Sequence, residues 1–536
     1  MTLTLHTVPR RDITVAAGLT VAVAAVLMLG PAPADAPAHL YRTFLVEHGA
    51  VIWDNLWYSG QYPLASYSLL YYFAAAVFGN IPLVAAAAVA STVLFALIAF
   101  HEWGTLARWP ARVFGVLAAA PLFTGLYSYT LGFATLLAVL HAIQRGKTWV
   151  AIVCAALTIG FSPLAFVFLC LILFALLLAR QQITSQAIVL IIAFALVGAA
   201  EAVALIVFPS KTVYPFNPVD LGAVVAVCAA GALLARRSDT GRFMMAFFVV
   251  WGASSVLAYL VPSAIGDNAT RLRAFVFPIM LVVAAQARFR PRWLTVAALA
   301  GALAYNIVPY LMLVPYRLDS RPETAAFWRP AIAFLHHHAD PNYRVEVVPT
   351  AAHWESYWIP RAGYALARGW YRQLDVTTNP ALYASHLTAA DYRTWLRQAS
   401  VNYILLAHTR LDPDGAPAEA KLLQSGSAKA RVVFRSANWT IYEAKNSEPL
   451  LTGPGPARIT TMGHQLISGV ATTQGVYLLR VHFNPYWQPN PRAYCIRSAP
   501  GGMTEIHLLQ PGPFTLRITD GVTSLFESII ASPTHC

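Results

Sequence analysis

The chain has 536 residues, of which 57% are hydrophobic and 11% are charged, and its mean hydropathy is +0.55. This composition excludes an ordinary soluble domain and predicts a polytopic α-helical membrane protein. The net charge of +13 owes much to short loops between apolar stretches, and no dense basic stripe with interleaved aromatic residues follows them. We therefore expect no nucleic-acid partner.

Apolar segments alternate with short basic loops over the first 315 residues. A polarity shift near Pro315 ends this pattern, and no later run is long enough to span a bilayer. The sequence thus predicts a transmembrane domain over residues 1–315 and a polar tail. We predict about eleven spans, at residues 13–30, 82–101, 112–127, 129–143, 148–160, 163–180, 187–208, 219–235, 243–262, 272–287 and 293–315.

Loop charges predict the orientation of these spans. Thirteen basic residues fall on one side: Arg10, Arg11, Arg108, Arg112, Arg145, Lys147, Arg180, Arg236, Arg237, Arg242, Arg288, Arg290 and Arg292. Four fall on the other: Arg42, Lys211, Arg271 and Arg273. Because cytoplasmic loops carry the excess of Lys and Arg, we expect a cytoplasmic N-terminus. An odd number of spans then places the tail outside.

The first outer loop, residues 31–80, is unusually long and rich in polar and aromatic side chains. Its segment Tyr62–Gly79 is apolar, but counting it as a span would put the basic loops on alternating sides, so we interpret it as interfacial or re-entrant. Asp35 stands at the head of the loop, where it could cap a helix beginning near Ala36 or act as a base, and the two roles are compatible. Asp54 is a second candidate base, because a carboxylate beside the hydrocarbon boundary is costly unless it is partnered or used.

The aromatic runs Trp53–Pro63 and Tyr67–Tyr72, placed after an acidic residue and a short amphipathic segment, resemble the first loop of the GT-C glycosyltransferases. The resemblance covers roughly residues 1–315. It implies a polyprenyl-phosphate sugar donor, an acceptor on the outer face and a C-terminal extracytoplasmic domain. Asp35 stands alone where many members have an acidic pair. No cofactor is therefore certain, and a divalent metal ion stays an open alternative.

Transfer from a lipid-linked donor needs cations for the leaving phosphate. Arg271 and Arg273 lie at the outer mouth of a predicted span against the positive-inside trend, and Lys211 lies in another outer loop. Arginine recognises phosphate through a rigid fork of donors, so these three residues are the predicted donor-phosphate ligands. The alternatives for the arginines are snorkelling and a local pair with Asp267.

The predicted acceptor or glycan ligands combine aromatic rings with hydrogen-bonding groups, as sugar sites do. They are His39, Trp57, Tyr58, His353, Trp354, Glu355, Trp358, Trp370, Arg372 and Gln373. The segments His353–Arg361 and Ala367–Asp375 also resemble bacterial multi-pass proteins labelled as related to 6-pyruvoyl-tetrahydropterin synthase. The alternative for these segments is a docking surface onto the membrane domain. The consecutive residues His336, His337 and His338 would point in different directions on a helix, so we predict a solvated helix end there rather than a metal site.

The tail divides by pattern into two predicted domains. Residues 316–450 predict an α/β module with helices at 325–338 and 391–398 and strands at 344–348 and 402–406. Residues 451–536 predict a small β-sandwich, with strands at 457–461, 475–483, 504–509 and 514–518. In an oxidising compartment Cys495 and Cys536 are expected to form a disulfide. Cys154, Cys170 and Cys228 lie in spans and are expected to pack as small side chains.

Two functions remain open at this point. The first is an inverting glycosyltransferase that moves a sugar from a polyprenyl-phosphate donor to a cell-envelope glycan or glycolipid on the outer face. The second is a non-enzymatic transporter, flippase or assembly scaffold for envelope glycolipids. A transporter would be expected to show inverted repeats with broken helices in both halves, and the break at Ser162-Pro163 has no obvious counterpart.

Overall fold

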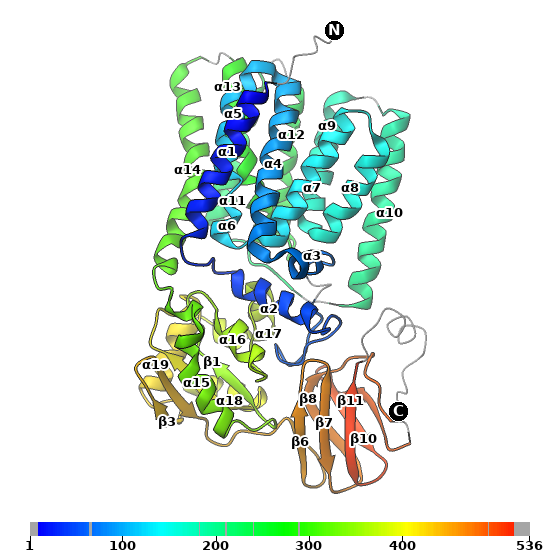
Figure 1. The fold of residues 1–536 in the computed structure, drawn as a ribbon, viewed down its shortest axis with the longest axis vertical. Helices are drawn as coiled ribbons and strands as arrows, with labels where there is room; N and C mark the ends of the chain where they lie inside the picture. The colour runs from blue at the N-terminus through cyan, green and yellow to red at the C-terminus, as the bar shows by residue number, and fades with distance from the viewer. Residues whose placement is uncertain are drawn as a thin grey trace. The chain divides into compact units, whose positions relative to one another are not determined.

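The computed structural model describes residues 9–63, 67–181, 183–209, 212–238, 241–287, 290–490 and 492–518 together with Cys536. The chain forms two compact units (Figure 1). The bundle unit consists of Met1–Pro33 and Tyr67–Leu318, and the C-terminal unit consists of Ala34–Ser66 and Asp319–Cys536. We call residues 34–66 the strap. The strap was predicted as part of the transmembrane domain, so its grouping with residues 319–536 differs from the expectation.

The bundle unit is entirely helical in its described residues. Its helices are α1 (Arg10–Met28), α3 (Tyr71–Phe78), α4 (Asn80–Trp103), α5 (Arg108–Leu117), α6 (Pro121–Thr124), α7 (Tyr127–Gln144), α8 (Thr148–Phe161), α9 (Pro163–Arg180), α10 (Ser185–Val207), α11 (Pro218–Ala235), α12 (Gly241–Leu260), α13 (Arg273–Ala287) and α14 (Arg292–Arg317), with 3-10 turns η1 (Gly104–Ala107) and η2 (Gly266–Leu272).

Eight helical segments of this unit are long and apolar enough to cross a membrane. They are Arg10–Met28, Asn80–Thr124, Pro163–Arg180, Ser185–Val207, Pro218–Ala235, Gly241–Leu260, Gly266–Ala287 and Arg292–Pro315. Each of the eleven predicted spans overlaps a helix, but α5 and α8 have only 10 and 14 residues, and α7 is not among the eight. The number eleven therefore stays a prediction.

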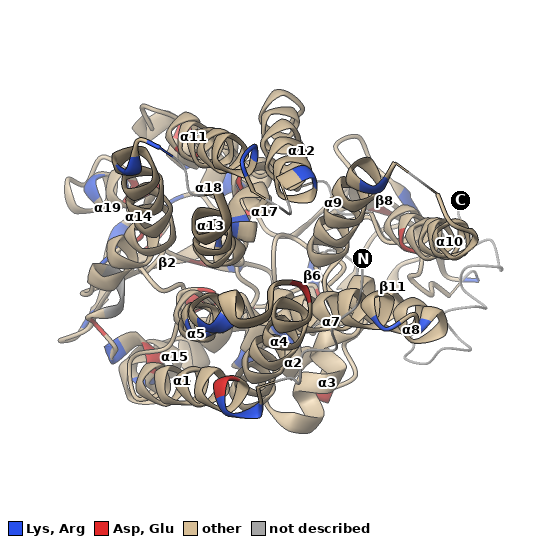
Figure 2. Cartoon of the chain, turned by 90° about the horizontal axis from the view of Figure 1, so that it is seen from above, with Lys and Arg blue, Asp and Glu red and all other residues tan. Residues whose placement is uncertain are grey.

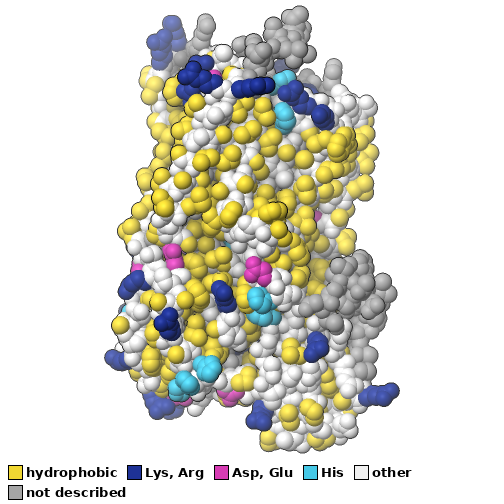
Figure 3. Space-filling view, viewed as in Figure 1, with side chains coloured by type: hydrophobic (Ala, Val, Ile, Leu, Met, Phe, Trp, Pro, Cys, Tyr) yellow, Lys and Arg dark blue, Asp and Glu magenta, His cyan; other side chains and the backbone are white. Residues whose placement is uncertain are grey.

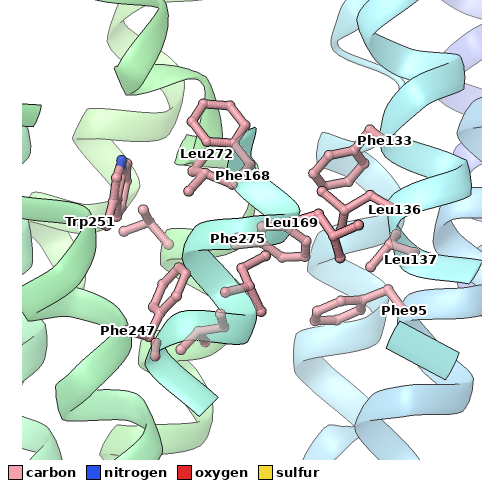
Figure 4. Close-up of a cluster of buried hydrophobic side chains, with 14 of the residues drawn as sticks. Phe95, Phe133, Leu136, Leu137, Phe168, Leu169, Phe247, Trp251, Leu272 and Phe275 are labelled. Atoms are coloured by element: carbon pink, nitrogen blue, oxygen red, sulfur yellow. The ribbon is translucent and has the colours of Figure 1, made fainter. Parts of the chain in front are cut away.

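Aromatic and small side chains build the centre of the bundle (Figure 4). The Phe275 ring lies 4.8 Å from that of Phe133 and 6.0 Å from that of Phe95, measured between centroids. Glycines allow close approach, because a Cβ added to Gly115 would lie 2.5 Å from the backbone oxygen of Ala16. Large apolar side chains cover the outside of the bundle, as expected where lipid tails are the solvent (Figure 3).

Several charged residues of the bundle lie near helix ends, and Figure 2 colours the acidic and basic residues on the ribbon. Asp12 in the first turn of α1 bonds Arg108 at 3.3 Å and Arg112 at 2.9 Å. Gln144 at the end of α7 donates to Glu102 near the end of α4 at 2.7 Å. These contacts hold the start of α1 beside the start of α5, and the end of α4 beside the end of α7.

The predicted interfacial element contains helix α3, whose eight residues are too few to span a bilayer. It is anchored at its start, where the backbone N–H of Leu70 donates to the Gly160 oxygen at 2.8 Å. Gly79, at φ 78°, separates it from α4, a backbone conformation that favours glycine.

The α/β part of the C-terminal unit is built on one mixed sheet of four strands in the order β1-β2-β4-β3. The strands are β1 (Arg344–Val347), β2 (Val401–Ala407), β3 (Arg431–Arg435) and β4 (Trp439–Glu443), with β1 and β2 parallel. Its helices are α15 (Ala325–His338), α16 (Glu355–Arg361), α17 (Arg372–Thr378), α18 (Ala389–Gln398) and α19 (Ala416–Gln424), with 3-10 turns η3 (Arg321–Glu323) and η4 (Pro380–Tyr383). The four elements predicted in this part correspond to α15, α18, β1 and β2.

The last part of the chain forms two antiparallel sheets, β5-β8-β10-β9 and β11-β7-β6. Their strands are β5 (Leu451–Thr452), β6 (Ala457–Met462), β7 (Leu466–Ala471), β8 (Gly475–His482), β9 (Tyr494–Ser498), β10 (Met503–Leu508) and β11 (Gly512–Arg517). The four predicted strands are present, whereas β5, β7 and β9 were not predicted. The sequence pattern of β7 is weak because Gly469 stands in the middle of the strand. A Cβ at this position would lie 2.5 Å from the Phe514 ring, so the close packing of that ring favours glycine.

The structure contains the predicted disulfide between Cys495 and Cys536, whose Cα atoms lie 5.3 Å apart. Cys495 belongs to β9, and 41 positions separate the two residues. Closing a loop of this length stabilises a domain by roughly 4 kcal/mol in the chain-entropy model.

Candidate functional site

Backbone and side-chain hydrogen bonds join the strap to the rest of the C-terminal unit. The Leu56 oxygen accepts from the Leu366 N–H at 2.9 Å, and the Trp57 indole donates to the Ser356 oxygen at 3.0 Å. The Ser59 oxygen accepts from the backbone N–H of His482, the last residue of strand β8, at 2.7 Å. The strap therefore bonds both the α/β part and the last sheets, through contacts between residues about 300 or more positions apart.

Asp35 lies at the start of the strap, immediately before helix α2 (Ala36–Glu47). It occupies the N-cap position, but its side chain makes no capping hydrogen bond. Instead its Oδ1 accepts from the indole Nε1 of Trp370 at 3.1 Å, and the residue is only partly buried. Asp35 therefore occupies the predicted capping position, but its side chain does not form the capping hydrogen bond. The carboxylate is directed to Trp370.

Trp370 connects Asp35 to a set of polar residues predicted as glycan ligands. The His353 ring stacks on Trp370 with centroids 3.2 Å apart and planes at 10°, and the Arg372 guanidinium lies 5.0 Å from the Trp370 ring. Arg372 donates to both oxygens of Asp412, at 2.7 and 2.8 Å. This fork fixes the guanidinium in one orientation.

Two members of this cluster, His353 and Arg372, have strongly shifted pKa values. Burial lowers the pKa of His353 to about 4, although the neighbouring Glu355 favours the charged form. Burial also opposes the charge of Arg372, but the hydrogen bonds and charge of Asp412 raise the pKa of the guanidinium well above its ordinary value. At neutral pH, His353 is therefore a neutral stacking partner and Arg372 a permanent cation.

A second group of buried charges continues from this cluster into the core. Arg368 donates to Glu346 at 2.9 Å through Nε and to Glu419 at 2.8 Å, and it lies 3.8 Å from Asp375. Tyr383 joins the two groups, because its hydroxyl bonds Asp375 and accepts from Arg372. The sequence prediction did not single out Arg368 or Asp375. Their charges within the aromatic run Ala367–Asp375 were the available signal.

Asp54 is a fully buried carboxylate with three hydrogen-bond donors. It accepts from the Tyr41 hydroxyl at 2.9 Å, from the Leu56 N–H at 3.1 Å and from His464 Nδ1 at 3.0 Å. This arrangement satisfies the carboxylate internally and gives Asp54 a structural role, and its catalytic role stays a prediction. His464 was not predicted, because no local pattern marks a single histidine in a turn.

The remaining predicted glycan ligands are mostly side chains of the domain interior. His39, Trp57, Tyr58, Trp354 and Glu355 are buried, and Trp358 and Gln373 are partly buried. Burial raises the pKa of the Tyr58 hydroxyl well above its usual range, and that hydroxyl accepts from the Tyr371 N–H at 3.3 Å. Within the described residues, the indole nitrogens of Trp354 and Trp358 are buried with no hydrogen-bond partner.

The predicted phosphate ligands belong to the bundle unit. Arg273, the first residue of α13, donates to the Thr270 hydroxyl at 2.7 Å and lies 5.5 Å from the Tyr305 ring. Arg271 is partly buried in η2, and its backbone oxygen accepts from Tyr129 at 3.1 Å. Lys211 lies outside the described residues.

No described residues form a group of three or more His, Cys, Asp or Glu side chains that could hold a metal ion. The three histidines of the α15 terminus are exposed on its last turn, as predicted for a solvated helix end. No family model matches this chain, and no curated protein matches it either.

Proposed function

We propose that the chain is an inverting GT-C-type glycosyltransferase that moves a sugar from a polyprenyl-phosphate donor to an envelope glycan or glycolipid. In this proposal the plasma membrane of a bacterium holds about eleven spans, the N-terminus is cytoplasmic, and the C-terminal unit is extracytoplasmic. Eight apolar helices of spanning length and the asymmetry of basic loop residues support this arrangement.

The observation that carries the proposal is the environment of Asp35. Asp35 is a partly exposed carboxylate at the start of the strap, its Oδ1 accepts from the Trp370 indole, and a carboxylate can take the proton of an acceptor hydroxyl. Asp54 differs in burial, because that carboxylate is fully buried among three donors, whereas Asp35 is partly exposed.

The proposed reaction is a single displacement at the anomeric carbon. As the acceptor oxygen bonds to the anomeric carbon, the bond from that carbon to the phosphate oxygen breaks on the opposite face, which inverts the configuration. The acceptor hydroxyl proton goes to the Asp35 carboxylate. The electron pair of the broken bond stays on the phosphate, whose charge Arg271 and Arg273 would stabilise.

Replacing Asp35 with asparagine tests this assignment. Asp35→Asn keeps the size of the side chain and an oxygen for the Trp370 indole but cannot take a proton, so turnover should fall by about 10²-fold or more while the fold survives. The measurement is transfer of labelled sugar by purified full-length protein. Asp340→Asn, an exposed aspartate in a turn, is the matched control. Retained turnover in Asp35→Asn would remove Asp35 as the base.

A non-enzymatic role is the second candidate, and one observation favours it. Most of the predicted acceptor ligands are buried, and several use their polar groups inside the domain, as Trp57 does with Ser356 and Glu355 with Thr350. A transporter, flippase or scaffold for envelope glycolipids would bind the lipid-linked sugar without cleaving it. Binding without any sugar transfer by the wild-type chain would favour this role.

A further inference from the structure

One ring of the strap, Phe44 on α2, is surrounded by nitrogen-bearing side chains. The His48 ring lies 4.0 Å from it and the His464 ring 5.9 Å, measured between centroids, and the Arg361 guanidinium carbon lies 5.7 Å from its centroid. We call Phe44, His48, Arg361 and His464 the Phe44 patch. All four belong to the C-terminal unit and none of them is fully buried.

His464 is held with one nitrogen inside and the other outside. Its Nδ1 donates to the buried Asp54 carboxylate, and its side chain is 23% exposed. Asn55 fixes the turn that carries it, because the Asn55 side chain donates to the Gly463 oxygen at 2.8 Å and its backbone N–H to the His464 oxygen at 2.9 Å. Two adjacent strap residues therefore position the ring and leave Nε2 for another partner.

The other two nitrogen groups are held in a similar way. His48 Nδ1 donates to the Phe44 oxygen at 2.8 Å, so its Nε2 is directed away from α2. The Arg361 guanidinium donates to the Tyr357 hydroxyl and lies 5.2 Å from the Tyr357 ring and 5.8 Å from the Trp358 ring. An aromatic base thus supports a guanidinium that has five donors in total.

We propose that the Phe44 patch binds the phosphate of a phosphorylated ligand. The Arg361 fork would donate to the phosphate oxygens, and the Nε2 atoms of His48 and His464 would hydrogen-bond the remaining oxygens. Phosphate is the ligand chemistry that suits a guanidinium fork flanked by two imidazole nitrogens beside aromatic rings. Two acidic residues lie near the patch. The Asp54 carboxylate accepts from His464, and Glu47 is exposed on α2, where its charge helps to raise the pKa of Tyr357.

Histidine modification read by mass spectrometry tests this site on the full-length protein in detergent. Diethyl pyrocarbonate reacts with accessible imidazole nitrogens, so a bound phosphate should slow modification of His48 and His464. The probes are farnesyl phosphate, farnesol and inorganic phosphate at one fixed pH. Protection by farnesyl phosphate alone identifies a lipid phosphate, whereas equal protection by inorganic phosphate identifies a free phosphate site.

Variants with opposite expected effects sharpen the result. Arg361→Gln should weaken protection roughly tenfold, because the fork is lost, whereas Glu47→Gln should strengthen it by removing a repelling charge. His337, exposed on the last turn of α15, is the internal control and should stay equally reactive throughout.

Three results would overturn the proposal: no protection of either histidine, equal protection by farnesol, or protection that Arg361→Gln leaves unchanged. Because the readout is binding, it is independent of the sugar-transfer assay with Asp35→Asn. Failure of either proposal can be recognised without the other.

Discussion

The two units of this chain are stabilised by different interactions. In the described bundle, apolar rings and small residues form the core, hydroxyls such as those of Thr20 and Thr92 bond each other within it at 2.8 Å, and the Asp12 ion pairs lie at helix starts. In the C-terminal unit, Arg368 and three carboxylates lie in the interior with almost no exposure. The bundle should therefore respond most to changes of volume, and the C-terminal unit to changes of charge.

The largest effect should follow from removing the buried cation. Arg368→Met leaves Glu346, Glu419 and Asp375 without their common partner, and breaking such a pair typically costs about 3 to 5 kcal/mol. The measurement is the urea midpoint for proteolysis of residues 319–536 in the full-length protein. Arg397→Met is the control, since its pair with Glu448 is half exposed and should contribute at most about 1 kcal/mol. Equal midpoints for Arg368→Met and wild type would contradict this account of the unit.

A smaller effect is expected from added volume in the bundle. A Cβ on Gly231 of α11 would lie 2.6 Å from the Phe248 ring of α12, so Gly231→Ala should destabilise the bundle by about 1 to 3 kcal/mol despite the better helix propensity of alanine. Gly301→Ala on α14 meets nothing within 4 Å and should be neutral or slightly stabilising. Thermal unfolding of both variants in one detergent measures the difference. Indistinguishable midpoints would show that α11 and α12 are not closely packed.

The difference between the units also explains what the sequence could predict. Hydropathy is a local signal, so all eleven predicted spans overlap helices, and the disulfide followed from two cysteines in one polar region. The strap depends on pairings such as Asn55 with His464, more than 400 positions apart, which no local pattern encodes. The same limit explains Asp54. Its carboxylate was recognised as unusual, but its partners Tyr41 and His464 could not be identified from sequence.

The smallest expected effect is a pH dependence of the C-terminal unit. Burial and the nearby carboxylates of Glu419 and Asp375 raise the pKa of Glu346, against the opposing effect of Arg368. A raised folded pKa means that the folded state holds the proton more tightly than the unfolded state. The contribution of Glu346 to stability should therefore be largest at low pH and fall as pH rises from about 4.5 through the folded pKa. Thermal midpoints measured from acidic to alkaline pH should show this slope.

Glu346→Gln is the variant that isolates this group. A neutral amide cannot titrate, so the slope should flatten, and Glu419, whose pKa burial also raises, should still contribute to the slope that remains. Asp391→Asn, at an exposed position of α18, should leave the slope unchanged. An unchanged slope in Glu346→Gln would place the titrating group elsewhere.

Hydrogen–deuterium exchange of the strap tests most directly whether residues 34–66 fold with the C-terminal unit. The amides of Asp54, Asn55 and Gln61 donate to backbone oxygens, so they should exchange slowly in the full-length protein, at rates close to those of β6 and β7. Arg368→Met should accelerate exchange in the strap and in residues 319–536 together, and leave α7 and α12 unchanged. A strap that exchanges within seconds in the wild-type protein would contradict the account.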